Sequence, residues 1–267
     1  SRYIAASLGI QFDQFVYGHA FTDNNYSESL RSKGLAHPYL GAFAHFAFDN
    51  RNSMYFTKRG VLLDISSTYR FLDFKQRGRR FGDVMFRFEG YIPLGGRVML
   101  SPRLYSRVLF GKYSDCGPYS NIPGYAYFTP NDGYEMAYAT YMGSLMPGKF
   151  IDQQLPFFGI NNPEEMYNNL AVAMLELRVN VYRKHYISAI GSFAREAFTF
   201  ADFFKPATMI PYSDVILYTG DEMTALNHWG AGLLYSFKSI AGPIRAGLAY
   251  SDVTKRVCAF VSLGLDF

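Results

Sequence analysis

Arginine and carboxylate side chains recur at every second position along several extended segments of this sequence. Arg87 and Glu89 are two residues apart, as are Glu176 and Arg178. Side chains two apart on a β-strand share one face, so these groups would form charged rows on one side of a sheet. The residues predicted to share this inner face as a charge network are Asp64, Arg70, Arg87, Glu89, Arg97, Arg103, Arg107, Glu176, Arg178 and Arg245.

Histidine and serine residues offer little further chemistry. His185 and Ser188 are three apart, so they lie on opposite faces of one extended segment and cannot act as an in-strand pair. The other histidines are scattered, and no paired carboxylates, metal cluster or phosphate-binding loop is recognisable in the sequence. We therefore expect no catalytic centre, no metal and no cofactor in this chain.

Alternation of apolar and polar residues predicts the strands that carry the charges. Leu175, Leu177 and Val179, for example, alternate with Glu176 and Arg178. Twelve segments qualify, an even number, as single-chain bacterial barrels require. They are 3–12, 15–21, 37–48, 61–71, 84–92, 97–110, 134–143, 169–181, 186–197, 229–237, 243–250 and 257–267.

The last predicted strand has one apolar face and ends on an aromatic residue. Leu263, Leu265 and Phe267 lie on the apolar face, and Ser262 and Asp266 lie on the other. This ending is typical of an outer-membrane β-barrel, and we expect these three residues to form the signal that the barrel-assembly machinery reads. Because such a protein must be exported, we also expect the numbered chain to be a mature or truncated piece.

The composition agrees with a membrane barrel. Of the 267 residues, 18% are charged, which is below the usual ~25%. The 22 Tyr and 25 Phe are enough for aromatic girdles at two membrane interfaces. No run of ~18 apolar residues occurs, which excludes a transmembrane helix. A net charge of +4 without a basic cluster does not favour nucleic acid as a partner.

These observations predict one domain, residues 1–267, that is all-β. It would be an antiparallel transmembrane β-barrel of about 12 strands in the bacterial outer membrane. A β-sandwich with a core rich in Phe and Tyr is the alternative fold. Cys116 and Cys258 fit no metal motif, and we expect them to be small unpaired residues.

Two functions could follow from a charged inner face. A ring of arginines could select anions in a pore. Alternatively, arginines and carboxylates on adjacent strands could pair, fill the ring and hold it rigid. We favour the paired network, because about twelve strands is fewer than the ~16–18 of open porins.

Connections between the strands are of two kinds. Short ones rich in Pro and Gly, at 92–96 and 239–243, and the pair Arg183-Lys184 predict tight turns at one end of the barrel. Long ones at 112–133, 144–168 and 198–225 are expected on the outside, the last with a short helix.

One hairpin resembles a known superfamily. Asp49-Asn50-Arg51-Asn52, followed by Thr57-Lys58-Arg59-Gly60, resembles the "Asp-x-Arg-Asn … Pro-Thr-Arg-Gly" hairpin of the bacterial surface antigen superfamily. That group includes outer-membrane assembly factors and two-partner-secretion transporters. Segments 230–235, 241–250 and 260–267 are similar to its last three strands, and 148–159 looks most like the C-terminal barrels of patatin-like phospholipases.

The resemblance implies an anchoring function. In patatin-like members a periplasmic lipase domain and a small linker domain precede the barrel. No Gly-x-Ser-x-Gly nucleophile elbow occurs in this sequence, so any lipase activity would lie upstream and this chain would not be an enzyme. The implied partners are outer-membrane lipid and an upstream periplasmic domain or a second copy of the chain.

The same resemblance makes an assembly or secretion channel the alternative function. Assembly factors of the superfamily carry an Arg-Gly pair on a loop folded into the lumen, which meets an Asp on a neighbouring strand. Here the loop has Gly148-Lys149-Phe150, and the strand at 187–193 has no Asp. Lys149 and Asp152 are the candidates for an inward-folded loop. The missing pair disfavours active protein insertion or secretion, and a small anion-leaning pore is the other alternative.

Overall fold

The chain folds into one large antiparallel sheet and one small sheet. The computed structural model describes residues 3–16, 36–53, 55–74, 80–111, 140–143, 154–160, 166–167, 169–197, 200–205, 225–240 and 242–264. The strands of the large sheet are β1 (Tyr3–Val16), β2 (Ala36–Asp49), β3 (Gly60–Asp73), β4 (Phe81–Gly95), β5 (Val98–Gly111), β9 (Asn169–Tyr182), β10 (His185–Ala197), β11 (Ala225–Ser239), β12 (Gly242–Ser251) and β13 (Val257–Leu263).

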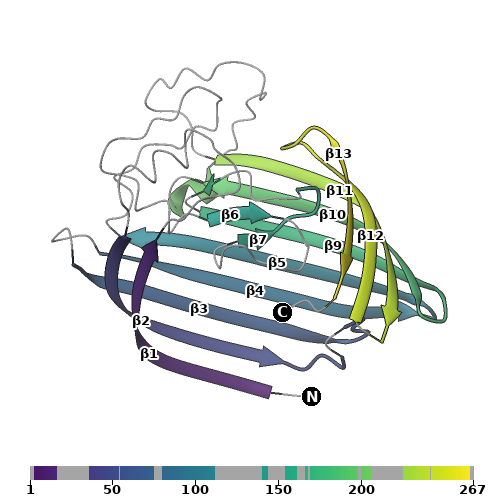
Figure 1. Ribbon diagram of the computed structural model, residues 1–267, viewed down its shortest axis with the longest axis horizontal. Helices are drawn as coiled ribbons and strands as arrows, with labels where there is room; N and C mark the ends of the chain where they lie inside the picture. The colour runs from purple at the N-terminus through teal and green to yellow at the C-terminus, as the bar shows by residue number, and fades with distance from the viewer. Residues whose placement is uncertain are drawn as a thin grey trace.

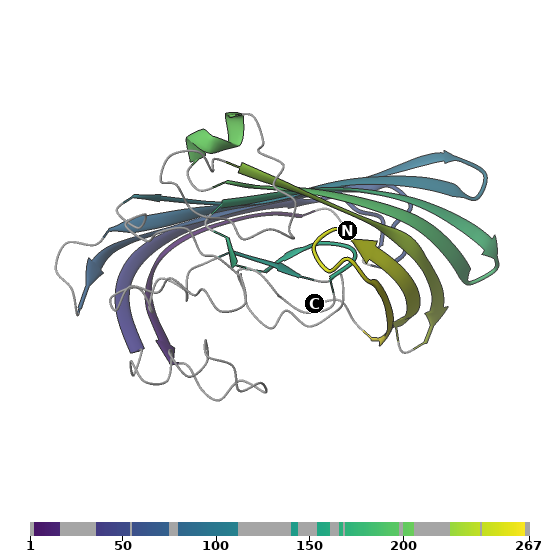
Figure 2. The ribbon, with the colours of Figure 1, turned by 90° about the horizontal axis from the view of Figure 1, so that it is seen from above.

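Each strand of the large sheet pairs with its neighbours in the sequence, so the topology is a meander (Figure 1). The sheet bends into a deep trough, with β1 at one rim and β13 at the other (Figure 2). The small sheet lies in the concavity and consists of β6 (Thr140–Gly143), β7 (Gln154–Pro156) and β8 (Met166–Tyr167), in the order β7-β6-β8. A short 3-10 helix, η2, covers Phe200–Phe204.

The predicted all-β, antiparallel fold is confirmed, and the number of strands in the large sheet is ten rather than twelve. Two of the predicted strands are not separate strands of the large sheet. Segment 15–21 begins inside β1, and segment 134–143 contributes β6 to the small sheet. The described strands do not close into a ring, because β1 and β13 do not pair with each other. In the described part of the chain, no helix is long and apolar enough to cross a membrane.

Alternating side chains divide between the two faces of the trough as the sequence predicts. Leu175 and Leu177 on the outer face of β9 are 50% and 41% exposed, whereas the intervening Glu176 is buried on the inner face. A β-sandwich would bury the leucines between two sheets. The alternative fold is therefore wrong, because among the described residues no second sheet packs on the face that carries these leucines.

The segment Gln154–Ile160, which we call the inward segment, fills the concavity on the side of β10 to β13. Phe157, Phe158 and Ile160 are buried there in an apolar cluster with residues of β9, β10, β11 and β12. The expectation that connection 144–168 lies outside is wrong for this segment. Burial of three large apolar side chains against the inner wall is the physical reason.

The predicted tight turns lie together at one end of the sheet. The turns β4–β5, β9–β10 and β11–β12 share one end with the β2–β3 connection, which we call the turn end. Arg183 in the β9–β10 turn has a φ of 42°, as two-residue hairpin turns of this hand require. The prediction of tight turns at one end is confirmed.

Candidate functional site

The connection between β2 and β3, called here the β2–β3 turn, is built by side chains of the hairpin motif. Asn50 donates its backbone N–H to Val61 O (3.0 Å), and Asn50 Oδ1 accepts from Val61 N (2.6 Å). Asn52 Oδ1 accepts the N–H groups of Lys58 (2.9 Å) and Arg59 (3.1 Å). The asparagines replace ladder partners that the bent chain lacks, so the motif fixes the shape of the turn.

Gly60 allows the two arms of this turn to approach closely. Its φ is 119°, and a Cβ there would lie 2.7 Å from Arg51 Cα and from Asn50 O. Any other residue would push the arms apart, because backbone atoms cannot yield at that distance.

Arg51 links the β2–β3 turn to the inner wall. Its guanidinium makes a two-point contact with Asp49 (Nη2 to Oδ2 2.9 Å, Nε to Oδ1 3.1 Å) and reaches Glu89 Oε2 at 3.5 Å. Burial alone lowers the pKa of the Arg51 guanidinium, but its hydrogen bonds with Asp49 and the nearby charge of Glu89 raise that pKa above the ordinary value. Arg51 therefore stays charged and holds the turn against β4.

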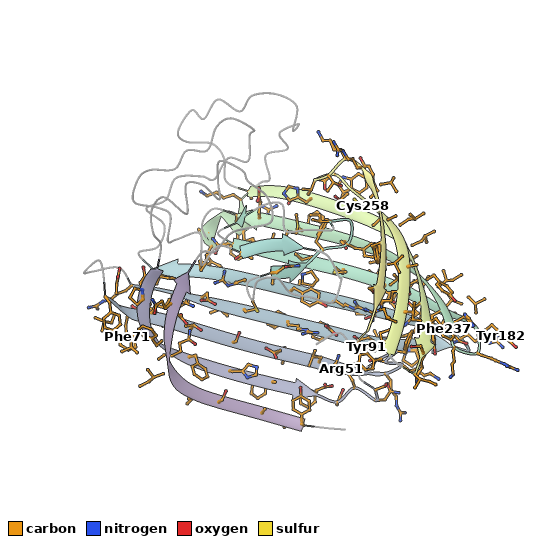
Figure 3. All side chains as sticks on the ribbon, in the orientation of Figure 1. Arg51, Phe71, Tyr91, Tyr182, Phe237 and Cys258 are labelled. Carbon is orange, nitrogen blue, oxygen red and sulfur yellow. The ribbon has the colours of Figure 1, made fainter. Side chains whose placement is uncertain are left out.

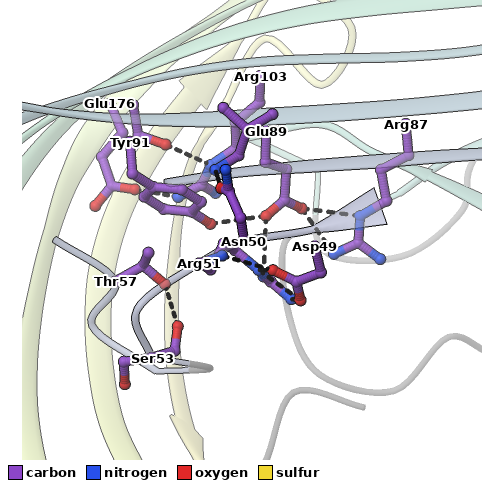
Figure 4. Close-up of polar contacts among 12 residues, drawn as sticks. Asp49, Asn50, Arg51, Ser53, Thr57, Arg87, Glu89, Tyr91, Arg103 and Glu176 are labelled. Carbon is purple, nitrogen blue, oxygen red and sulfur yellow. Dashed lines mark hydrogen bonds and ion pairs between the residues drawn. The ribbon is translucent and has the colours of Figure 1, made fainter. Parts of the chain in front are cut away.

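Glu89 on β4 is the centre of a buried polar group that we call the Glu89 cluster (Figure 4). Arg87 Nη2 donates to Glu89 Oε1 at 2.7 Å, and the hydroxyls of Tyr91 (2.7 Å) and Tyr105 (3.0 Å) donate to its two oxygens. With Arg51, four side chains from β4, β5 and the β2–β3 turn meet this one carboxylate. A buried carboxylate is stable when it has such partners.

Glu176 on β9 is the centre of a second group, the Glu176 cluster. It forms an ion pair with Arg103 of β5, accepts a hydrogen bond from Ser188 Oγ of β10 (2.7 Å) and lies 3.8 Å from Arg178 Nε. The two clusters adjoin, because Arg103 and Tyr105 are on the same face of β5 (Figure 4). Together they tie β4, β5, β9 and β10 at the turn end.

The β2–β3 turn reaches across the trough to β9 and β10. Arg178 Nη2 donates to Thr57 O at 2.8 Å, and Phe56 stacks on Tyr186 with ring centroids 4.5 Å apart. Thr57 itself is 2% exposed. A connection that begins on β2 and β3 therefore spans the inner faces of β4 and β5 to reach β9 and β10.

A third group, the Asp83 cluster, ties β1, β3, β4 and β5. Arg70 donates to Asp13 Oδ2 and to Asp83 Oδ1, both at 2.7 Å. Arg107 lies 3.5 Å from Asp83 Oδ2 and donates to Thr140 Oγ1 of the small sheet at 3.1 Å. Arginines and carboxylates thus alternate over β1, β3, β4 and β5, with Arg70 reaching Asp13 across the intervening β2.

Most residues of the predicted inner charge network belong to one of these three clusters, and three of them lie elsewhere. Arg97 does not belong to it: it is exposed in the β4–β5 turn and donates to Val181 O (3.1 Å), because β5 begins one residue later. Asp64 pairs with His45 at 3.2 Å. Arg245 lies on the inner face of β12, opposite Ser236 and Ser262.

Several other predicted site residues lie near the ends of the described segments or outside them. Lys149 and Asp152 lie outside the described residues, although the inward segment begins two positions after Asp152. Leu263 is on the outer face and 67% exposed, and Leu265 and Phe267 lie outside the described residues. Cys258 is a free thiol, and Cys116 also lies outside the described residues.

Sequence reasoning missed Asp13, Asp49, Arg51 and Asp83 as members of the clusters. A signal was present for Asp83, which precedes the predicted strand 84–92 by one residue and has the parity of Arg87. Asp13 follows the predicted strand 3–12 in the same way. Asp49 and Arg51 were noticed only as part of a hairpin motif, and nothing local shows that this hairpin turns inward.

The clusters give paired charges and no evident reactive centre. His185 Nδ1 lies 2.7 Å from Tyr235 Oη, and Ser188 bonds to Glu176, so the two residues serve different contacts. No three His, Cys, Asp or Glu residues of the described ranges are grouped to hold a metal. No protein-family model matches the chain, and a search of the curated proteins finds no match either.

Proposed function

We propose that this chain is a wall of an outer-membrane β-barrel with a filled interior, and that it anchors a periplasmic domain. The main support for this proposal is that the large sheet has an apolar outer face and an inner face on which charges are paired. Hydrocarbon around the trough would cover Leu8, Leu175 and Leu233, which are 50% to 84% exposed.

Aromatic side chains at both ends of the outer face support a membrane setting. Tyr182 and Phe237 lie at the turn end, and Phe71 lies at the opposite end (Figure 3). Trp229 and Tyr250 also belong to that far end, with ring centroids 5.4 Å apart. Aromatic rings favour the two membrane–water interfaces, and the apolar band of a barrel lies between them.

The filled interior supports an anchor rather than an open channel. The β2–β3 turn covers the turn end, and the inward segment occupies the space against β10 to β12. In a planar bilayer the full protein should show only rare, small openings. Steady conductance of porin size would refute the anchor. Liposome flotation tests insertion separately, and phospholipid cleavage by residues 1–267 alone would contradict a role without catalysis.

A small anion-leaning pore is the second candidate, and one observation favours it. The side chains of His45, Asp64 and Arg87 on β2, β3 and β4 are 36%, 35% and 44% exposed on the inner face. A water path along these strands would need a cation at its wall. Replacing Arg87 with Ala should lower anion selectivity if ions pass there, and should leave selectivity unchanged if openings arise elsewhere.

We further propose that the chain belongs to the bacterial surface antigen superfamily, closest to patatin-like barrels. The support is the hairpin motif. Asn50, Asn52 and Arg51 make hydrogen bonds that shape the β2–β3 turn, and Gly60 allows its two arms to approach closely. The full reading frame upstream of Ser1 provides the test. A Gly-x-Ser-x-Gly elbow there would support the lipase domain, and tandem linker domains alone would favour assembly or secretion.

A further inference from the structure

A shallow apolar groove crosses β10 to β13 on the outer face of the large sheet. Its volume is about 550 Å³, within the ~300–1,000 Å³ that is usual for small-molecule sites. The groove is deepest over the small side chains of Ala246 and Ala259. The larger apolar side chains around it are 47% to 73% exposed and belong to Ile187, Leu233, Leu248 and Val261. Such a depression can hold a flexible hydrocarbon chain.

The groove lies close to the turn end. Tyr235, Ala246 and Val261 are paired in one row across β11, β12 and β13. One outer row, which includes His185 and Phe237, lies between them and the turns, and two residues of a strand span ~7 Å. His185 Nδ1 lies 2.7 Å from Tyr235 Oη, and its ring packs on Phe237 with centroids 4.8 Å apart. Amphipathic rings therefore separate the groove from the turns, as at a membrane interface.

The exposed charges in the four connections of the turn end are all cationic. The nearest carboxylates, Asp49 and Glu89, are buried on the inner face and paired with arginines. The exposed cations of these connections are Lys58, Arg59, Arg97, Arg183, Lys184 and Lys238. At the opposite end of β12, by contrast, a partly exposed Asp252 accompanies Lys255 and Arg256. The turn end is therefore suited to anions.

Three of these cations belong to the turns that join the strands of the groove. The backbone N–H of Lys238 donates to Lys184 O at 2.9 Å, so the β9–β10 and β11–β12 turns are in contact. The Arg183 guanidinium lies 5.1 Å from the centroid of the Tyr182 ring, and Tyr182 and Phe237 both lie at this end of the sheet (Figure 3). Long basic side chains at this level can cover apolar surface with their stems while their charges contact phosphate.

We propose that the groove and the cations beside it bind one anionic glycerophospholipid, of the phosphatidylglycerol type; this inference rests on the proposed membrane function. An acyl chain lies in the groove over Ala246 and Ala259, and the headgroup phosphate contacts Arg183, Lys184 and Lys238. Short barrel turns face the periplasm, so the lipid belongs to the periplasmic leaflet. Each basic residue near a membrane surface strengthens binding of anionic lipid about fivefold.

A second copy of the chain fits the groove less well. Copies in one membrane have the same orientation, so a contact about a two-fold axis would place both turn ends at the same level. Arg183, Lys184 and Lys238 of the two copies would then approach each other, and their turns contain no carboxylate to pair with them. Like charges at such a contact oppose association.

Native mass spectrometry of the full polypeptide, released from nanodiscs with equal amounts of phosphatidylglycerol and phosphatidylethanolamine, tests the site. We expect the protein to retain phosphatidylglycerol at least about tenfold more than phosphatidylethanolamine. Combining Arg183→Gln, Lys184→Gln and Lys238→Gln should bring this ratio close to one. Ala246→Phe, which fills the groove, should lower retention of phosphatidylglycerol at least about tenfold.

Two matched controls should leave retention unchanged. Lys58→Gln, Arg59→Gln and Arg97→Gln together remove the same number of cations from the other connections of the turn end. Ala44→Phe adds the same ring to the outer face of β2, where Ala44 lies opposite Leu8. Ala259→Phe is a second variant that fills the groove, and heat-dependent gel mobility shows which variants have folded.

The other outcomes overturn the proposal. Equal retention of the two lipids would show no preference, and an equal loss in the control with three substitutions would show diffuse attraction rather than a site. Unchanged retention in the folded groove variants would exclude the groove, and loss of a dimer in them would assign the groove to a second copy. If the protein fails to float with liposomes, the proposed membrane function fails first; if it floats without lipid preference, only this inference fails.

Discussion

At the scale of single residues, burial makes each charge depend on its partners. Glu89 is 4% exposed and has four polar neighbours, whereas the Asp64 side chain is 35% exposed and pairs with His45. Removing a buried carboxylate leaves its arginine partner with less counter-charge in a medium of low polarity, which is costly. Removing an exposed carboxylate leaves a partner that water can solvate, which costs little.

Replacing Glu89 with Gln should therefore lower the free energy of unfolding by about 3–5 kcal/mol, because Arg87 loses its carboxylate partner and Arg51 keeps only Asp49. Asp64→Asn is the matched control, and its loss should stay within about 1 kcal/mol. Urea titration of the refolded protein in detergent, followed by tyrosine fluorescence or circular dichroism, measures both. Equal losses for the two variants would show that the Glu89 cluster is not a centre of stability.

At the scale of elements, the inward segment and the β2–β3 turn decide what the interior can do. The inward segment docks on β11 through glycine: a Cβ at Gly230 would lie 2.2 Å from Phe158 O, and Ser192 Oγ accepts the Phe158 N–H at 3.2 Å. The β2–β3 turn docks on the opposite wall through Phe56 and Tyr186. Both elements are held by contacts remote in sequence.

Gly230→Ala should displace the inward segment, because the clash is with a backbone oxygen that cannot rotate away. We expect a loss of about 1–3 kcal/mol in the free energy of unfolding. Gly191→Ala is the matched control on the adjacent strand, where a Cβ would meet nothing within 4 Å, and it should change stability by less than about 0.5 kcal/mol. Thermal unfolding checked by gel mobility compares them, and an unaffected Gly230→Ala variant would contradict the docking.

Phe56→Ala should loosen the β2–β3 turn by removing its stack on Tyr186, 4.5 Å away. An aromatic pair contributes about 0.5–1.5 kcal/mol beyond its buried area, so openings should become about 2- to 12-fold more frequent if the turn closes a path. Tyr182→Ala, which removes an exposed outer aromatic residue at the same end, should leave the frequency unchanged. Single-channel recording decides, and identical traces would show that the turn closes nothing.

At the scale of the whole molecule, the trough has one side suited to hydrocarbon and one packed with polar and apolar filling. The single Trp of the chain, Trp229, is 51% exposed on the outer face of β11. It lies at the end of the sheet opposite the turn end, beside the β12–β13 turn, where an interfacial aromatic residue is expected if the chain lies in a membrane.

If the chain lies in a membrane as proposed, the fluorescence of Trp229 should report contact with lipid. In liposomes its fluorescence should be quenched by lipids brominated near the head of the acyl chain more than by lipids brominated near the tail. Iodide in the surrounding water should quench weakly. Efficient quenching by iodide together with none by brominated lipid would place the outer face in water and refute the membrane proposal.

Much of the fold could be predicted from local pattern, because a strand shows its two faces in every second residue. The assignment of Leu175 outward and Glu176 inward needed only the period of two. The strand count was harder: segment 134–143 has a strand-like pattern, and only its tertiary placement shows that β6 joins the small sheet. The sequence predicted which arginines and carboxylates lie on the inner face, but it did not predict which of them pair with each other.

The sequence by itself determined which side chains share a face, since alternation is a local property of an extended chain. It also determined two of the tight turns, through the Pro and Gly residues at 92–96 and 239–243. Only the tertiary structure decided that Arg178 meets Thr57 and that Phe158 packs beneath Gly230. Those contacts join segments between about 70 and 120 residues apart, and they exist because the sheet bends far enough to bring its opposite walls within reach of one turn and one loop.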